Sequence, residues 1–409
     1  MDRRELEAKG YLVTPGFLDL HAHLREPGFE DSETIASGAR AALRGGFTTI
    51  CAMPNTEPAI DSPGLVAEVI ARGHAAGGAR VLPIATITRG RAGRDLSDLV
   101  ELSAAGAVAF SDDGSPVDDA RLFRHALEYM RTKDLLLIEH AQDTELSAKG
   151  VMNEGIVSAR LGLPGIPNAA EETAVARDIA IAEMTGARLH LTHISTRGAV
   201  ASIRDAKARG LRITCDVTPH HLSMTDDWVA GSREFAWERE GLEKPPARAV
   251  PYDSATKVNP PLRTWKDVRA LWEGLADGTV DAIATDHAPH ASVGKDVEFD
   301  LAAFGISGLE TALSLVFGGV NAGWCDRDTA IRALTTGPAH VLGISVRDDD
   351  WIAIDPDAEW TVTAESLASK GKNTPLLGRA LRGQVVYAVV GGEARYEGGL
   401  RGATPVGSR

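Results

Sequence analysis

The chain has 409 residues, of which 44% are hydrophobic and 24% charged, a composition typical of globular proteins. This length suits one large α/β barrel with an appendage, or two to three smaller domains. The net charge of −14 argues against a binding surface for nucleic acid or anionic membranes. The three cysteines are scattered, no apolar run approaches the roughly 18 residues of a membrane span, and no signal-peptide pattern opens the chain. We therefore expect a soluble protein of the reducing cytoplasm.

From residue 17 onward, apolar runs of strand type alternate with segments of helical pattern. Strands are predicted at 17–21, 47–53, 81–87, 107–110, 135–140, 188–193, 211–217 and 280–286. Helices are predicted at 32–45, 61–76, 117–132, 170–185, 306–320 and 327–343. Eight strand–helix units in succession favour a (β/α)8 barrel of the TIM type over an open doubly wound sheet.

The barrel domain is predicted to span residues 17–344. Residues 1–16 and 345–409 are predicted to form a small accessory β unit, reduced at its N-terminal end. Alternating apolar residues predict antiparallel strands at 351–354, 360–362 and 384–390. About the last ten residues are predicted to be disordered. The charged connection at 226–256 is a lid or, the interpretation we favour, a surface insertion.

Two histidines stand two residues apart at the end of the first apolar run. Residues i and i+2 of a strand point to the same face, so His21 and His23 can present two imidazoles to one point. This arrangement suits a metal such as zinc. Arg25 continues the alternation and places a cation beside that point. The alternative is a strand with two buried, hydrogen-bonded histidines.

Other metal-binding residue types also follow predicted strands, and in such barrels the chemistry lies at the carboxyl ends of the strands. The candidate ligands are His21, His23, Asp113, His140, His193 and Asp286. The first two with Asp286 would hold one ion, and His140 with His193 a second. Asp113 can bridge the two ions, with Asp112 competing for that role.

A two-metal site of this kind activates a water molecule and polarises a carbonyl group. Asp286 can accept the proton of the attacking water and deliver it to a leaving nitrogen. The residues thus predict metal-assisted hydrolysis of an amide-type bond.

Six segments, in this order, resemble dihydroorotases of the bacterial type I branch of the amidohydrolase superfamily. They are HAHLREPG at 21–28, MPNT at 53–56, FSDDG at 110–114, LTHIST at 191–196, KVNPPLR at 257–263 and TDHAPH at 285–290. The resemblance implies a zinc-dependent, reversible ring closure of N-carbamoyl-L-aspartate to L-dihydroorotate in de novo pyrimidine biosynthesis. It also implies one or two zinc ions per subunit, held by the six candidate ligands. Many members of the superfamily bridge their metals with a carboxylated lysine. No lysine stands at the end of strand four here, so an aspartate is the implied bridge, as in the resembled branch. Asp113 is preferred over Asp112 because its distance to His140 fits that branch better.

The resemblance further implies a set of substrate contacts. Arg25, Asn55 and His290 would bind the substrate carboxylate, and a guanidinium is the best bidentate partner for that group. Asn259 and the backbone of Phe304 and Gly305 would contact the pyrimidine ring.

Two alternatives remain open at this point: a related cyclic amidohydrolase of the allantoinase or hydantoinase kind, and a catalytically silent scaffold partner of aspartate carbamoyltransferase. The expected partner is a small-molecule substrate, with a homodimer and an association with aspartate carbamoyltransferase both possible. Relatives usually begin earlier than this chain, so we expect a truncated start or a reduced accessory unit, with intact metal chemistry but lower stability or altered assembly.

Overall fold

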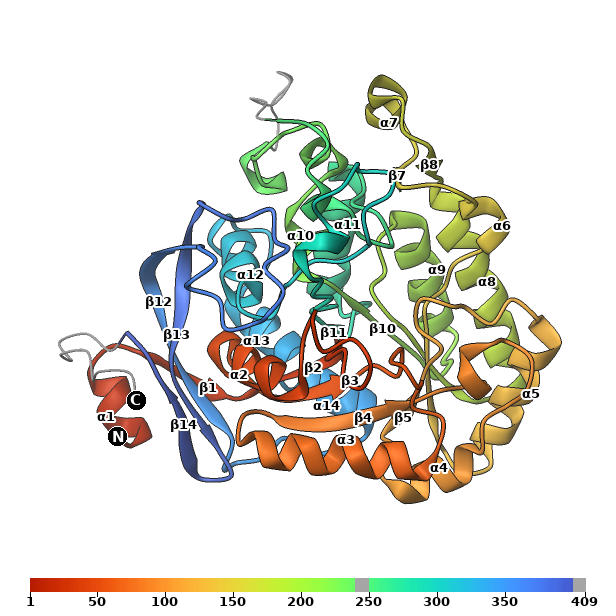
Figure 1. The fold of residues 1–409 in the computed structure, drawn as a ribbon, viewed down its shortest axis with the longest axis horizontal. Coiled ribbons are helices and arrows are strands. Elements are labelled where there is room, and N and C mark those ends of the chain that lie inside the picture. The colour runs from red at the N-terminus through yellow and green to blue at the C-terminus, as the bar shows by residue number, and fades with distance from the viewer. Residues whose placement is uncertain (240–249, 400–409) are drawn as a thin grey trace.

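The computed structural model describes residues 1–239 and 250–399. Eight parallel strands wind around a central axis with helices outside them (Figure 1). In chain order they are β2 (Phe17–Ala22), β3 (Phe47–Ala52), β4 (Arg80–Ala85), β5 (Ala109–Phe110), β6 (Leu136–Glu139), β9 (Arg188–Leu191), β10 (Ile213–Val217) and β11 (Ala282–Ile283). They lie side by side in chain order. The predicted (β/α)8 barrel is confirmed.

The barrel closes between its first and last strands. The backbone of His23 donates to the carbonyl of His287 at 2.8 Å, and Ala22 forms a parallel bridge with His287. Below this bridge, the buried Asp19 carboxylate of β2 accepts the backbone N–H of Thr285 at 2.8 Å. These contacts take the place of a regular pattern of backbone hydrogen bonds between β2 and β11. This explains why β11 is shorter than the predicted strand at 280–286.

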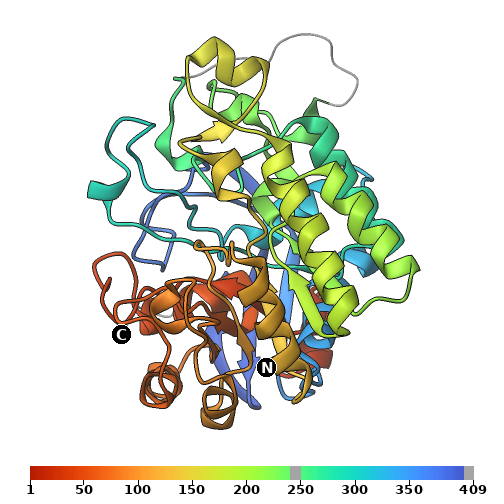
Figure 2. The same ribbon diagram turned by 90° about the vertical axis from the view of Figure 1, so that its right-hand side faces the viewer.

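Helices cover the outside of the barrel, and Figure 2 shows several of them running alongside its strands. The longer ones are α2 (Ile35–Gly45), α3 (Pro63–Ala76), α4 (Leu99–Ala105), α5 (Ala120–Arg131), α8 (Asn168–Thr185), α9 (Arg197–Ala208), α11 (Trp265–Asp277), α12 (Ala312–Asn321), α13 (Arg327–Leu334) and α14 (Thr336–Leu342). Short elements in the loops are α6 (Thr144–Ser147), β7 (Met152–Asn153), α7 (Ile156–Leu161), β8 (Gly165–Ile166) and α10 (Pro219–Ser223). The single helix predicted at 327–343 is wrong, because Thr335 has φ −126° and ψ −85° and separates two helices.

Local sequence signals explain where these helices begin and end. The Thr34 side chain accepts from the Ser37 N–H and caps α2, and Asp119 caps α5 in the same way. Gly46 ends α2 in the left-handed conformation, with φ 90°. A Cβ at Gly46 would lie 2.9 Å from Ile352 and 3.0 Å from Phe17, so this turn also packs tightly against both sheets.

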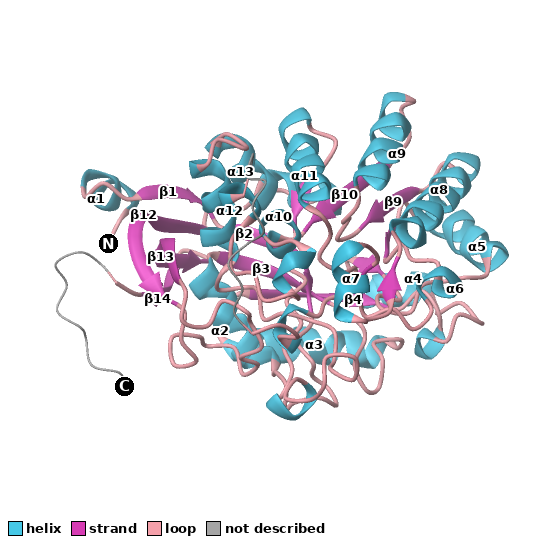
Figure 3. Cartoon of the chain, turned by 90° about the horizontal axis from the view of Figure 1, so that it is seen from above, coloured by secondary structure: helices cyan, strands magenta, loops and turns pink. Residues whose placement is uncertain are grey.

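A second sheet of four antiparallel strands packs against one side of the barrel, as the view from above shows (Figure 3). Its strands are β1 (Leu12–Pro15), β12 (Trp351–Thr361), β13 (Ala380–Val390) and β14 (Glu393–Glu397), in that spatial order. The strands predicted at 351–354 and 360–362 are one strand, in which a register shift between Asp355 and Glu359 breaks the alternation. A short helix not predicted from the sequence, α1 (Arg3–Ala8), buries Leu6 against this sheet. The division of the chain at residues 16 and 344 stays a prediction.

Residues 226–236 of the 226–256 connection are packed, so the favoured surface insertion is wrong for them, whereas Val250 and Tyr252 at its other end are exposed. Trp228 is fully buried and stacks on Phe235 with ring centroids 5.5 Å apart. Both rings belong to an apolar cluster that also contains Val362 and Leu376. The rest of this connection, and the predicted disorder of the last ten residues, lie outside the described residues.

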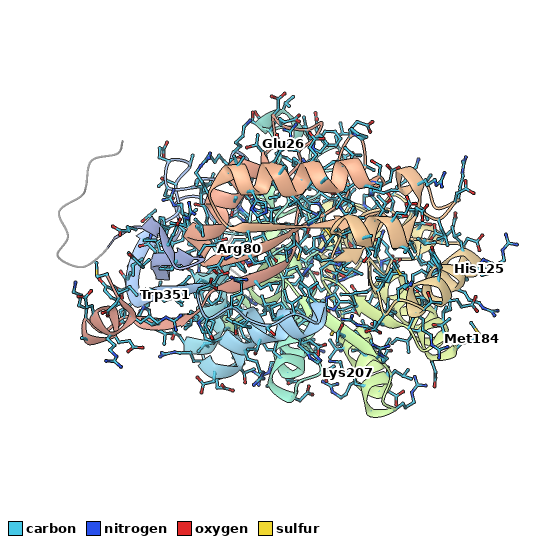
Figure 4. All side chains as sticks on the ribbon, turned by 90° about the horizontal axis from the view of Figure 1, so that it is seen from below. Glu26, Arg80, His125, Met184, Lys207 and Trp351 are labelled. Atoms are coloured by element: carbon cyan, nitrogen blue, oxygen red, sulfur yellow. The ribbon has the colours of Figure 1, made fainter. Side chains whose placement is uncertain are left out.

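Figure 4 shows the molecule from below, with labelled side chains around the barrel. His125 on α5 and Met184 on α8 lie toward its outer edge, and Met184 is 58% exposed.

Among the residues with described structure, we find no helix with both the length and the apolar run needed to cross a bilayer.

Candidate active site

The structure brings all six predicted ligands together at the carboxyl ends of the barrel strands. Three of them form one group. His21 Nε2 lies 3.2 Å from His23 Nε2, and Asp286 Oδ1 lies 3.0 Å from His23 Nε2 and 3.5 Å from His21 Nε2. The two imidazoles come from the end of β2, and the carboxylate follows β11.

The remaining three ligands form a second group beside the first. His140 Nδ1 lies 3.0 Å from His193 Nε2. Asp113 Oδ1 lies 3.4 Å from His193 Nε2 and 3.5 Å from His140 Nδ1. These residues follow β6, β9 and β5.

Asp113 faces both groups at once. Its second oxygen, Oδ2, lies 3.5 Å from His21 Nε2 and 3.6 Å from His23 Nε2. The neighbouring Asp112 has other partners: its Oδ1 accepts the N–H of Ile87 at 2.8 Å and that of Thr88 at 3.1 Å. Asp113 therefore lies between the two groups of histidines, whereas Asp112 supports the loop after β4.

The backbone is strained where these side chains turn into the mouth. His193 has φ 40°, Asp286 has φ 45° and Arg25 has φ 60°, a region that residues other than glycine rarely adopt. Such strain persists only where surrounding contacts fix it, and it concentrates at functional sites. His193 shows such a contact, because its N–H donates to Asp216 Oδ1 at 2.7 Å.

Three of the four histidines have their second ring nitrogen held by an oxygen. His21 Nδ1 meets Thr192 Oγ1 at 2.9 Å, and His23 Nδ1 meets Asn55 Oδ1 at 2.8 Å. His140 Nε2 meets Gln142 Oε1 at 3.0 Å. An amide oxygen can only accept, so the nitrogens of His23 and His140 that face the site carry a free lone pair.

The site needs positive charge between its carboxylates. Burial acts to raise the pKa of Asp113, but the adjacent His21, His140 and His193 hold it well below its usual value. Burial acts to lower the pKa of His21, but the charges of Asp113 and Asp286 raise it to about 9.

The donor set fits divalent metal ions. Within each of two groups, His21–His23–Asp113 and Asp113–His140–His193, one ligand atom per residue lies within 4.8 Å of the others. Imidazole nitrogen and carboxylate oxygen are ligands for zinc and for other divalent transition metals. Lone pairs converging on two points with one shared carboxylate are what a two-metal site requires.

All six residues predicted to contact substrate line the cavity above these ligands. They are Arg25, Asn55, Asn259, His290, Phe304 and Gly305. Arg25 Nη2 lies 3.3 Å from His290 Nε2, which in turn meets the carbonyl oxygen of Phe304 at 2.8 Å. Two lining residues were not predicted, Gly114 and Ala288. Gly114 adjoins Asp113, and Ala288 lies between Asp286 and His290, so proximity in sequence was the available signal.

Lys295 lies just behind the cavity wall and was not predicted either. It is 7% exposed, and its Nζ donates to the carbonyls of Ser254 at 3.0 Å and Lys257 at 3.2 Å. Burial, together with the charge of Lys257, lowers the pKa of Lys295 to about 7. These two hydrogen bonds connect the loop after β11 to the loop that carries Asn259.

This lowered pKa predicts a pH-dependent stability. Between pH 7 and pH 10.5 the unfolded chain binds a proton at Lys295 that the folded chain does not, so the free energy of unfolding rises with pH. The stability of the wild type relative to Lys295→Met should therefore increase by at least about 1 kcal/mol from pH 7 to pH 10. Urea unfolding at both pH values measures it. The exposed Lys149, changed to Met, is the control and should show no such trend.

The fold and the site together define a class, that of (β/α)8-barrel proteins with two His–Asp groups able to hold metal ions at the carboxyl ends of the strands. The L-hydantoinase (dihydropyrimidinase) of Arthrobacter aurescens superposes with a TM-score of 0.78 at 23% identity, covering 96% of this chain and 87% of that one. A dihydropyrimidinase of Brevibacillus agri gives a TM-score of 0.74 at 21% identity, covering 95% and 85%. At this identity the likeness concerns the fold.

Sequence comparison is more specific. A family model described as dihydro-orotase-like matches residues 10–199. A dihydroorotase of Anaeromyxobacter dehalogenans is 51% identical over 404 residues, covering 97% of this chain and 89% of that protein. A dihydroorotase of Pelotomaculum thermopropionicum is 50% identical over 394 residues, covering 95% and 87%. The chain belongs to the dihydroorotase family.

Proposed function

We propose that this chain is a zinc-dependent dihydroorotase, which interconverts N-carbamoyl-L-aspartate and L-dihydroorotate in pyrimidine biosynthesis. The single observation that carries the proposal is the position of Asp113, whose two oxygens lie 3.4 to 3.6 Å from nitrogens of all four histidines. Around it, His21, His23 and Asp286 would hold one zinc ion, and His140 and His193 the other.

The substrate carboxylate would bind where Arg25 and His290 meet. The Arg25 side chain faces the cavity and uses its Nε on the carbonyl of Pro289 at 3.1 Å. The guanidinium group of Arg25 is planar and permanently charged, which suits a carboxylate. Asn55, whose Oδ1 is engaged with His23, can offer its NH2 group to the same carboxylate.

The pyrimidine ring would lie against Asn259 and the backbone at Phe304 and Gly305. The carbonyl of Phe304 accepts from His290, and that of Gly305 accepts from Asn373 at 3.0 Å. Each carbonyl keeps a second lone pair, which can accept a ring N–H. Asn259 Oδ1 is buried without a hydrogen-bond partner among the described residues, as expected of a group that awaits a ligand.

When bound, the zinc ions supply a water of lowered pKa and polarise the carbonyl that is attacked. Asp286 would take a proton from the attacking water and return it to the ring nitrogen as the C–N bond breaks. In the direction of ring closure, Asp286 would take the proton from the carbamoyl nitrogen as it attacks the carboxyl carbon, and would pass that proton to the carboxyl oxygen that leaves when its C–O bond breaks. Arg25 and His290 would bind the substrate carboxylate that does not react, and would keep it in place in both directions of the reaction.

Turnover of L-dihydroorotate by the purified protein, followed in the ultraviolet, tests the function. Metal content should be one to two zinc ions per chain, and removal by a chelator should abolish turnover until zinc is restored. Full activity of metal-free protein would contradict the zinc assignment. No turnover of the zinc-loaded protein would contradict the function itself.

The substrate-carboxylate assignment predicts the phenotype of Arg25→Ala. Loss of a bidentate, charge-assisted contact should raise the KM for L-dihydroorotate roughly 10- to 100-fold and change kcat much less. Arg25→Lys keeps the positive charge but cannot make two parallel hydrogen bonds to a carboxylate. Its KM should therefore lie between those of the wild type and Arg25→Ala. Steady-state kinetics in both directions measure this split. An unchanged KM in Arg25→Ala would show that the carboxylate binds elsewhere.

A hydantoinase-like activity is the second candidate, favoured by the likeness of the fold to the hydantoinase of Arthrobacter aurescens. The cavity argues for an anionic substrate instead, because Arg25 and His290 face it together. Hydantoins without a carboxylate discriminate between the candidates, and we expect little or no turnover of them.

A further inference from the structure

The segment between β12 and β13, residues 362–379, leaves the accessory sheet and reaches the mouth of the barrel. Two contacts fix it there. The Glu310 carboxylate accepts the N–H of Ala368 at 2.8 Å. The Ser307 hydroxyl donates to the carbonyl of Gly371 at 2.8 Å. A part of the chain remote in sequence from every ligand thus lies beside the candidate active site.

Asn373 is the residue of this segment that engages the site most fully. Its Nδ2 donates to the carbonyls of Ala288 and Gly305, both at 3.0 Å. Its Oδ1 accepts the backbone N–H of His290 at 2.9 Å, and the Ser307 hydroxyl oxygen, whose one proton goes to Gly371, also lies 2.9 Å from it. Both donors of the side-chain amide and one of its acceptor lone pairs are therefore used. The residue is 7% exposed.

Three of these four partners, Ala288, His290 and Gly305, line the active-site cavity. They come from two separate stretches of the loop after β11. His290 Nε2 donates to the Phe304 carbonyl at 2.8 Å, and Arg25 Nη2 lies beside the same nitrogen at 3.3 Å. Asn373 therefore fixes the spacing between the two halves of the wall that faces the substrate.

Gly371 provides a second, independent contact with the same wall. A Cβ built on Gly371 would lie 2.5 Å from Pro289 Cβ and 2.8 Å from the backbone nitrogen of His290. Only a residue without a side chain permits this approach without displacing the wall. The 362–379 segment thus touches the wall through its backbone as well as through Asn373.

We propose that Asn373 is a positioning residue for substrate binding, which holds His290 and the Phe304–Gly305 backbone in the spacing that the substrate requires. The inference rests on the proposed function and assigns a part of it to the accessory region. Loss of the amide would leave several buried backbone groups unsatisfied, and the two stretches would separate. Displacement of binding groups by about 1 Å is enough to weaken a productive complex strongly.

The experiment compares variants of Asn373 with the zinc-loaded wild type. Asn373→Ala should raise the KM for L-dihydroorotate roughly tenfold and leave kcat within about threefold. Asn373→Asp should raise KM further, because it directs a carboxylate oxygen at the carbonyls of Ala288 and Gly305. The matched control is Ser366→Ala in the same segment, where the Ser366 hydroxyl has Thr363 as its partner among the described residues. It should lower the Tm without changing KM.

A Tm loss in Asn373→Ala with KM within about twofold of the wild type would overturn the inference. If Asn373→Ala does not fold, Gly371→Ala decides: a raised KM supports the inference, and an unchanged KM overturns it. Turnover of L-dihydroorotate by the wild type is measured first. Its absence would refute the proposed function rather than the role of Asn373, so the two failures are distinguishable.

Discussion

Asp113→Ala is expected to abolish turnover and to release at least one of the bound metal ions. The carboxylate of Asp113 lies 3.4 to 3.6 Å from nitrogens of all four histidines. Without it, the imidazoles of His140 and His193 contact no carboxylate among the described residues. The ligand that two cations would share is also lost. We expect kcat to fall about 10³-fold or more. Metal analysis after gel filtration and single-turnover kinetics measure both effects.

The adjacent Asp112 provides the matched control. Its oxygens hold the N–H groups of Ile87 and Thr88, so Asp112→Asn should cost about 1–3 kcal/mol of stability without loss of metal. The two substitutions are at adjacent positions, but Asp113 contacts the four histidines and Asp112 contacts the loop after β4. Metal loss in Asp112→Asn with metal retained in Asp113→Ala would reverse the assignment of the bridge.

Two periodic signals in the sequence predict much of the fold and of the candidate site. Apolar runs alternating with helical patterns predict the eight strands, because a strand buried on both faces reads as a continuous apolar run. The spacing of His21 and His23 predicts convergent imidazoles, because residues two apart share a face of a strand. Their approach to 3.2 Å in the structure agrees with this geometry.

Contacts between remote segments were not predictable in this way. Spacing alone does not separate Asp112 from Asp113; the choice depends on Thr88, which lies beside Asp112 only in the folded chain. Asn373 contacts Ala288 across 85 positions, and nothing in the local pattern of its segment marks it.

Breaks in periodicity explain the errors in the secondary structure. β12 is one strand of 11 residues, but its register shifts between Asp355 and Glu359, so its alternation reads as two strands. α1 has six residues, too few to show a helical period, and its signal is the capping box of Asp2 and Glu5. Trp228 lies among charged residues, so its burial depends on an aromatic cluster that forms only in the fold.

Asp286→Asn is expected to lower kcat about 10³-fold while changing KM by no more than a few-fold. Asp286 Oδ1 lies 3.0 Å from His23 Nε2, between the ligand group and the cavity. The amide keeps the size of the side chain but cannot accept and return a proton, so the loss should be equal in both directions of the reaction. Because Asp113, His140 and His193 are untouched, the ion that they bind should remain.

The control for Asp286→Asn is Asp281→Asn, five residues earlier, at the opposite end of the barrel. The Asp281 carboxylate accepts from Lys207 Nζ at 2.5 Å and from the backbone N–H of Cys215 at 2.8 Å, so its loss should affect stability rather than kcat. Steady-state kinetics in both directions, with metal analysis of each variant, separate loss of a ligand from loss of the proton carrier. An Asp286→Asn variant that retains its metal and at least a tenth of the wild-type kcat would exclude Asp286 as the proton carrier. Another group, such as His290, would then have to move the proton, and Asp286 would be a ligand alone.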